Sequence, residues 1–233
     1  MPRESYQTQL DALREDVLYM SEIVLERLRM GLDALERKDE DLAWEVIDGD
    51  GEINDMYLDL ERDCIDLLAL QQPVAGDLRF VAASFKIITD LERVGDLATN
   101  LGEYSLEARQ DVYPEVDIQG IGDDVVGMLE TAMETYATEE ADMCVAIAEQ
   151  DEGIDRRCTE ASEVVVRDLI ETEIGPDGTT EIGPDSEPKI EALMDDVSRL
   201  LLTIRDLERI GDHAVNIAAR TMYMAENDDE LIY

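Results

Sequence analysis

Apolar side chains recur at every third or fourth position along most of the chain, which is the spacing of one buried face of an α-helix. The first half predicts a long helix that ends near Lys38, a second that stops near Pro73, and a third over about residues 74–107. Proline lacks a backbone donor and disfavours helix before it, which supports the second break. The apolar faces comprise Leu10, Leu13, Val17, Met20, Val24, Leu28, Leu32 and Leu35, then Val46, Ile53, Tyr57, Leu60, Cys64 and Leu67, and then Ile87, Leu91, Val94, Ala98 and Leu101.

The same rhythm returns in the second half. Turn-forming residues at 113–114 and 120–122 predict a linker before it. A fourth helix follows, then a fifth over about residues 139–171 and a sixth over about 188–225. Between the last two helices the hexapeptide TEIGPD occurs twice, and its glycines and prolines predict a loop. The pattern therefore predicts an all-α chain of six helices.

Two segments on the third and sixth helices are nearly identical. DLERVGDLATN begins at Asp90 and DLERIGDHAVN at Asp206, and eight of their 11 positions match. The preceding helices repeat as well, because DGEIN from Asp50 aligns with DEGID from Asp151. Two tandem three-helix bundles related by internal duplication are the simplest architecture. We place them at residues 1–113 and 117–226, followed by an acidic tail at 227–233.

Each repeat carries polar residues four positions apart, which lie on one face of a helix. Asp50 and Asp151 are unusual because each falls in the apolar rhythm of its helix, where a carboxylate is costly unless it is paired or bound to metal. Antiparallel packing around a turn near residue 72 would place 50 and 54 opposite 92 and 96. One polar row is Glu92, Asp96 and Asn100, and its counterpart in the second half is Glu208, Asp212 and Asn216. The residues predicted to converge in the first half are Asp50, Asn54, Glu92 and Asp96. In the second half they are Asp151, Asp155, Glu208 and Asp212.

Two interpretations of these clusters remain open. Oxygen ligands without His or Cys suit hard cations such as iron, manganese, magnesium or calcium. Alternatively, Arg93 and Arg209 form ordinary buried ion pairs with Asp50 and Asp151. Carboxylate pairs also arise by chance in so acidic a chain. We interpret His213, the single histidine, as incidental.

Gly95 and Gly211 lie inside the predicted helices, where glycine costs about 1 kcal/mol relative to alanine. Close approach of a neighbouring helix or of a ligand explains them. Descent from one ancestral half explains them equally well.

The net charge of the chain indicates the salt concentration in which it works. The chain has 19 basic and 59 acidic residues, a formal net charge of −40. Such a chain repels itself unless molar salt screens the charges, so a salt-rich cytoplasm is its expected setting. Nucleic-acid binding is excluded because no basic stripe is present to meet phosphates. No apolar run is long enough to span a membrane, and the three cysteines lack a metal-ligand spacing.

The pattern DLER[IV]GDxxxN, present twice on the third helix of a predicted bundle, resembles the PhoU family of phosphate-signalling regulators. The segment QQPVAGDLR at residues 71–79 is similar to that family's turn into the helix, and the resemblance extends from about Tyr6 to Ala225. It implies a cytoplasmic, dimeric, non-enzymatic protein that restrains phosphate uptake. The implied partners are the ATPase subunit of the phosphate ABC transporter and, in bacteria, a sensor histidine kinase. The acidity suggests a salt-loving archaeal member.

The resemblance also implies metal, since some members of the family hold multinuclear iron or zinc clusters through paired E/DxxxD motifs. Three such motifs are complete here, whereas Asp50 is followed by Asn54, which weakens the first cluster. The alternative functions are a carboxylate-bridged metal-storage or oxidase bundle and a metal-free helical adaptor. Ferritin-like di-metal sites need Glu-x-x-His pairs, which this chain lacks. The three complete motifs are Glu92/Asp96, Asp151/Asp155 and Glu208/Asp212.

Overall fold

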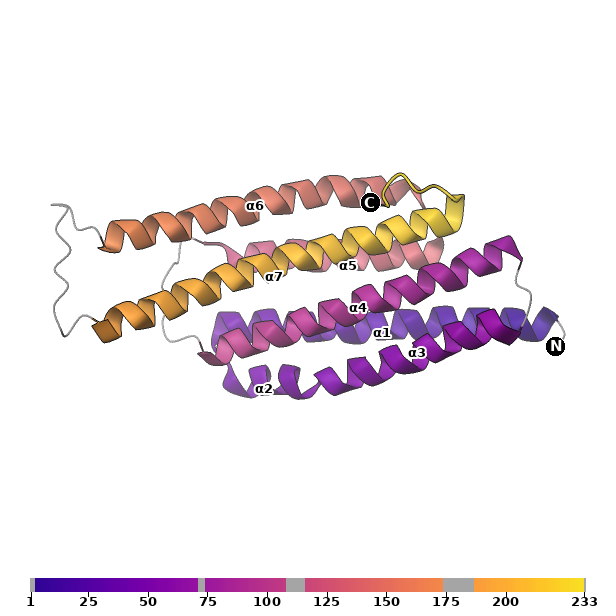
Figure 1. Ribbon diagram of the computed structural model, residues 1–233, viewed down its shortest axis with the longest axis horizontal. Helices are drawn as coiled ribbons and strands as arrows, with labels where there is room; N and C mark the ends of the chain where they lie inside the picture. The colour runs from indigo at the N-terminus through magenta and orange to yellow at the C-terminus, as the bar shows by residue number, and fades with distance from the viewer. Residues whose placement is uncertain (1–2, 71–73, 108–115, 174–186, 233) are drawn as a thin grey trace.

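The computed structural model describes residues 3–70, 74–107, 116–173 and 187–232, and its regular elements there are α-helices (Figure 1). This confirms the predicted all-α class. The turn near Pro73, the linker residues 113–114 and the hexapeptide loop lie outside the described residues. The helices are α1 (Arg3–Arg37), α2 (Glu40–Asp48), α3 (Asp50–Leu70), α4 (Ala75–Glu107), α5 (Ile118–Thr138), α6 (Asp142–Glu173) and α7 (Glu187–Glu226).

The predicted second helix is in fact two helices, α2 and α3. Asp39 accepts a hydrogen bond from the backbone N–H of Leu42 at 3.1 Å and so caps α2, which confirms the break near Lys38. The prediction of a continuous helix beyond it was wrong, because α2 ends at Asp48. Arg27 of α1 bridges the two pieces by donating to the Glu45 carbonyl at 3.4 Å and to the Glu52 carboxylate at 3.1 Å. Asp50 therefore begins α3.

The predicted linker at Gly120-Ile121-Gly122 is wrong, because these residues belong to α5. Asp117 caps this helix by accepting a hydrogen bond from the Gly120 backbone at 2.9 Å. Ile121 is buried, and a Cβ on residue 122 would come within 2.6 Å of the Leu32 side chain in α1. Gly122 thus permits close packing of α5 on α1, Gly120 leaves room for the capping carboxylate of Asp117, and neither glycine forms a turn.

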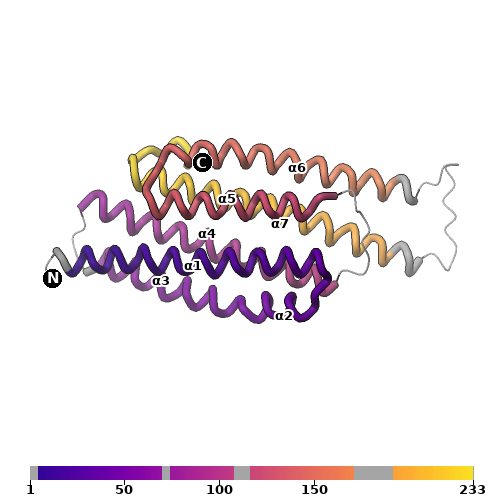
Figure 2. The backbone as a smooth tube through the Cα atoms, turned by 180° about the vertical axis from the view of Figure 1, so that it is seen from behind, coloured from indigo at the N-terminus to yellow at the C-terminus, as the bar shows by residue number. Residues whose placement is uncertain are grey.

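The helices form two layers. In the first layer α3, α4, α7 and α6 lie side by side in that order (Figure 1). In the second, α1 and α5 pack behind α4 and α7, as the view from behind shows (Figure 2). We call the side of the four-helix layer that faces away from α1 and α5 the outer face.

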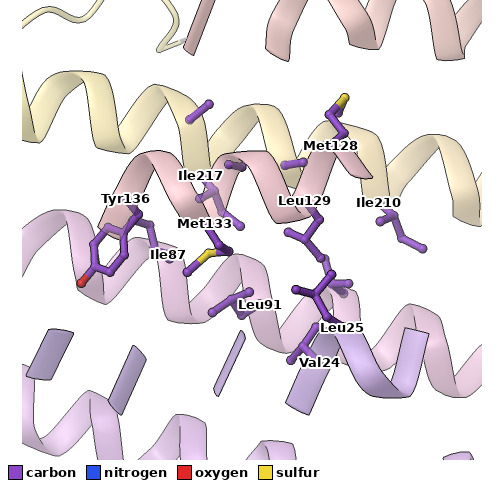
Figure 3. Packing of buried hydrophobic residues seen from close by; sticks show 14 of the residues in the cluster. Val24, Leu25, Ile87, Leu91, Met128, Leu129, Met133, Tyr136, Ile210 and Ile217 are labelled. Carbon is purple, nitrogen blue, oxygen red and sulfur yellow. The ribbon is translucent and has the colours of Figure 1, made fainter. Parts of the chain in front are cut away.

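The two halves share one hydrophobic core between the layers. Its buried cluster contains Leu25 and Leu91 of the first half beside Leu129 and Ile217 of the second (Figure 3). Each fully buried side chain of this size contributes about 1.5–3 kcal/mol. This core continues across the halves, so they pack against each other as one body. The domain boundaries at residues 113 and 117 stay a prediction.

Candidate functional site

The duplicated motifs meet along α4 and α7. Asn100 and Tyr104 of α4 donate to the Asp206 carboxylate of α7 at 3.0 and 2.9 Å. In return, Asn216 of α7 donates to the Asp90 carboxylate of α4 at 3.3 Å. Asp90 corresponds to Asp206 and Asn100 to Asn216 in the repeat, so this reciprocity places a local two-fold axis between the two helices. We call these contacts the seam.

The seam corrects two predictions. Asn100 and Asn216 do not point in the same direction as Glu92 and Glu208. Each asparagine lies eight residues after its glutamate, which is two helical turns plus a further rotation of about 80° around the helix axis. His213 is not incidental, since its Nδ1 lies 2.9 Å from an Asp90 carboxylate oxygen. The first aspartate and the last asparagine of each motif therefore join the two halves, whereas the central carboxylates face the neighbouring helix of their own half.

In the first half, Asp50 is held by its neighbours. Its carboxylate accepts hydrogen bonds from Asn54 at 2.8 Å and from Thr99 of α4 at 3.4 Å. Burial raises the pKa of Glu92, and the charges of Asp96 and Asp50 raise it further. The structure thus brings Asp50, Asn54, Glu92 and Asp96 together, and we call them the first cluster.

Arginine neutralises part of the first cluster. Arg93 lies 3.4 Å from the Glu92 carboxylate and 3.1 Å from that of Asp96. The predicted ion pairs of Arg93 with Asp50 and of Arg209 with Asp151 are wrong, because Arg209 instead contacts Asp206 at 3.5 Å. Both arginines line a cavity of about 300 Å³ beside Asp50, so the first cluster opens beside the seam.

The second cluster contains Asp151 and Asp155 of α6 with Glu208 and Asp212 of α7. Burial, followed by the charges of Asp155, Asp212 and Glu208, raises the pKa of Asp151 to about 7. Burial, followed by the charges of Asp155 and Asp212, also raises the pKa of Glu208. One buried oxygen of Asp151 and one of Asp155 have no hydrogen-bond partner among the described residues. A buried carboxylate left in this state is costly unless a proton or a cation satisfies it.

Gly211 makes room for this second cluster. A Cβ at that position would lie 2.7 Å from a carboxylate oxygen of Asp151. At the equivalent Gly95 the nearest atom is instead a methyl carbon of Ile53, at 3.0 Å. Close approach of the preceding helix therefore accounts for both glycines.

The two clusters differ in how well they fit a cation. In the second, four carboxylates and two unsatisfied oxygens supply the donors that a hard cation prefers. In the first, Asn54, Thr99 and Arg93 already satisfy the carboxylates. Across the part of the chain that the structure describes, no three His, Cys, Asp or Glu side chains are already arranged to hold a metal ion. The second cluster thus has the donor chemistry of a cation site, and its side chains would have to turn inward to close around an ion.

None of the described helices combines the length and the apolar character needed to cross a membrane.

Comparison with known proteins gives one consistent result. A family model described as the PhoU domain matches residues 17–105 and 118–221. A phosphate-specific transport system accessory protein PhoU homolog of Pseudomonas putida is 30% identical, over 97% of this chain and 82% of the relative. Homolog 1 of Methanothermobacter thermautotrophicus is 32% identical, over 96% of this chain and 95% of the relative.

Solved structures agree with the sequence comparison. The crystal structure of PhoU from Pseudomonas aeruginosa matches with a TM-score of 0.83 at 28% identity, covering 96% of this chain and all of that chain. The phosphate transport system regulatory protein PhoU from Streptococcus pneumoniae matches with a TM-score of 0.81 at 26% identity, covering 96% of this chain and 98% of that chain. The shared architecture therefore extends over nearly the whole molecule.

Proposed function

Because this chain belongs to the PhoU family, we propose that it regulates phosphate uptake as an accessory protein of a phosphate transport system, without catalysing a reaction itself. The supporting observation is that PhoU domain matches cover both halves of the chain, at residues 17–105 and 118–221. In this proposal the protein acts in the cytoplasm as a homodimer and restrains uptake when phosphate is plentiful. Its partner is the ATPase subunit of the phosphate ABC transporter and, where the organism has one, a sensor kinase.

Deletion of the gene in its host tests the regulatory role. We expect cells without the protein to keep taking up labelled phosphate in phosphate-rich medium, and the wild-type gene to restore shut-off. Normal shut-off in the deletion strain would contradict the proposal. The partner is tested by co-purification of the ATPase subunit in molar salt with excess phosphate, where its absence would remove that subunit as the contact.

We also propose that the second cluster binds a hard metal cation, with iron or zinc as the candidates. The supporting observation is the pair of buried carboxylate oxygens without partners on Asp151 and Asp155. The first cluster binds such ions more weakly because Asn54 replaces one carboxylate.

Metal analysis of protein purified in high salt tests this second proposal. We expect stoichiometric metal in the wild type and loss of it in a folded Glu208→Gln/Asp155→Asn variant. Wild-type protein without metal would favour the metal-free adaptor. Turnover of dioxygen by bound iron would favour the oxidase alternative.

A further inference from the structure

The thiol of Cys158 lies beside the second cluster. Asp151, Asp155 and Cys158 follow one another along α6 at steps of four and three residues, so all three project from one face of that helix. Cys158 is 1% exposed, and together with Glu208 of α7 it lines a cavity of about 640 Å³. A sulfur atom and a carboxylate of the second cluster therefore meet at the wall of one cavity.

The electrostatic surroundings of the thiol agree with this placement. Burial raises the pKa of Cys158 to about 12, and the negative charges of Glu208 and Asp155 are the next largest causes. Cys144 is buried on the same helix, but the carboxylate that raises the pKa of its thiol is Glu226. Of the two cysteines of α6, Cys158 is thus the one that lies beside the second cluster.

The repeat shows that the second half has the stronger metal donors along this helix face. The residues of α3 that correspond to Asp155 and Cys158 are Asn54 and Tyr57. The hydroxyl of Tyr57 donates to the carboxylate of Glu61, one turn further along α3, at 3.4 Å. A carboxylate in place of an amide and a thiol in place of a phenol both favour the second half as a ligand set for a transition metal.

A sulfur ligand changes which cation such a cluster prefers. Carboxylates alone suit hard ions such as magnesium and manganese, whereas thiolate is a preferred ligand of zinc. A coordinated thiol loses its proton: the S–H bond breaks, a sulfur–metal bond forms and the proton passes to water. The buried oxygens of Asp151 and Asp155 that have no partner among the described residues supply oxygen donors beside the sulfur.

We propose that Cys158 is a metal ligand of the second cluster and that its sulfur makes this cluster select zinc over manganese and magnesium. The inference rests on the proposed metal site and assigns to it a mixed set of sulfur and oxygen ligands.

Cobalt(II) is the probe, because it takes the place of zinc and its bond to a thiolate absorbs strongly in the near ultraviolet. Titration of the metal-depleted, full-length protein in molar KCl should produce this absorption in the wild type. Cys158→Ser and Cys158→Ala should each abolish it and should weaken zinc binding, measured by competition with cobalt, about tenfold or more. Manganese binding, followed by the electron paramagnetic resonance of the free ion, should stay as in the wild type. Cys158→Ala replaces the serine variant if circular dichroism shows that the latter unfolds.

Cys144→Ala is the matched control, since this cysteine is 0% exposed on the same helix. It should retain the absorption and the affinity for zinc. The Glu208→Gln/Asp155→Asn variant should lose the absorption although it keeps the thiol, which would locate the sulfur–metal bond in the second cluster.

Cobalt binding without the thiolate absorption would overturn the role of Cys158 and leave the carboxylate metal site standing. Absorption that persists in Cys158→Ala or in Glu208→Gln/Asp155→Asn, or that Cys144→Ala removes equally, would overturn the assignment as well. If the wild type binds neither cobalt nor manganese, the proposed metal site itself is wrong and this inference falls with it.

Discussion

At the scale of single residues, Asp151 makes the stability of the cation-free protein depend on pH. Burial and then the charges of Asp155, Asp212 and Glu208 raise its pKa from 3.8 to about 7. The folded state therefore holds this proton more tightly than the unfolded chain, and the resulting stability is complete below about pH 4 and is lost as the pH rises through about 7. Urea denaturation in EDTA should show a fall in the free energy of unfolding on the order of 2 kcal/mol, about half of what the full shift in pKa would give, because solvent screens this half-exposed carboxylate.

Two variants separate this effect from other titrations. Asp151→Asn should make the decline between about pH 4 and pH 7 much shallower, with a remainder from Glu208 and Asp212, whose pKa values burial also raises. Asp50→Asn should retain the full decline. An unchanged slope in Asp151→Asn would show that other groups cause it. Bound metal should reverse the trend, since a cation competes with the proton and binds more tightly as the pH rises.

Asn54 is the residue that distinguishes the two clusters. Asn54→Asp replaces the donor that lies 2.8 Å from Asp50 with a second carboxylate, so the metal-free protein should lose about 1–2 kcal/mol of stability. Added Mn²⁺ should then raise the melting temperature of the variant more than that of the wild type. Asp155→Asn is the reciprocal control, and it should reduce the stabilisation by metal. If Asn54→Asp shows no added response, the first cluster is not a latent cation site.

At the scale of the helices, Gly211 tests how tightly α6 and α7 pack. Alanine at 211 would place its Cβ 2.7 Å from the Asp151 carboxylate, so the gain in helix propensity is offset by displacement of that carboxylate. Gly127→Ala in α5 is the control, because nothing lies within 4 Å of its Cβ position. We expect Gly127→Ala to stabilise the protein by about 0.5–1 kcal/mol and Gly211→Ala to destabilise it. Equal stabilisation of both variants would show that the Asp151 side chain moves away freely.

The seam between α4 and α7 should be a cooperative pair of contacts. Asp206→Ala leaves the donors of Asn100 and Tyr104 unpaired, which should cost about 1.5–3 kcal/mol. A double-mutant cycle with Asn100→Ala measures the coupling between the two partners. Zero coupling energy would mean that the hydrogen bond contributes nothing to joining the halves.

The same helices show why sequence predicts some features and misses others. Helix rhythm is local, so the apolar faces of α1 and α4 follow from spacing alone. The break at Gly49 depends on Arg27, and the helical state of Gly122 depends on its packing against Leu32. Both partners are distant in sequence. Hairpin geometry indicates that Asp50 faces α4, because both helices belong to one half. The pairing of Asp90 with His213 depends on how α4 lies against α7, which no local spacing encodes.

At the scale of the whole molecule, net charge should make stability depend on salt. Some of the carboxylates that make up the net charge of −40 lie close enough to repel one another. At Asp63, burial raises the pKa most, and the negative charges of Asp16, Asp66 and Asp59 raise it further. Such repulsion acts over about 10 Å in 0.1 M salt and about 3 Å in 1 M salt. The melting temperature, measured by circular dichroism, should therefore rise by roughly 10 °C or more between 0.1 and 2 M KCl.

An Asp59→Asn/Asp63→Asn variant relieves part of the repulsion, so its melting temperature should rise less with salt. Sucrose at the same osmolality as the potassium chloride is the control, because it does not screen charges. It should raise the melting temperature much less than the salt does. An equal rise in sucrose would show that exclusion of the solute from the protein surface, and not charge screening, causes the effect.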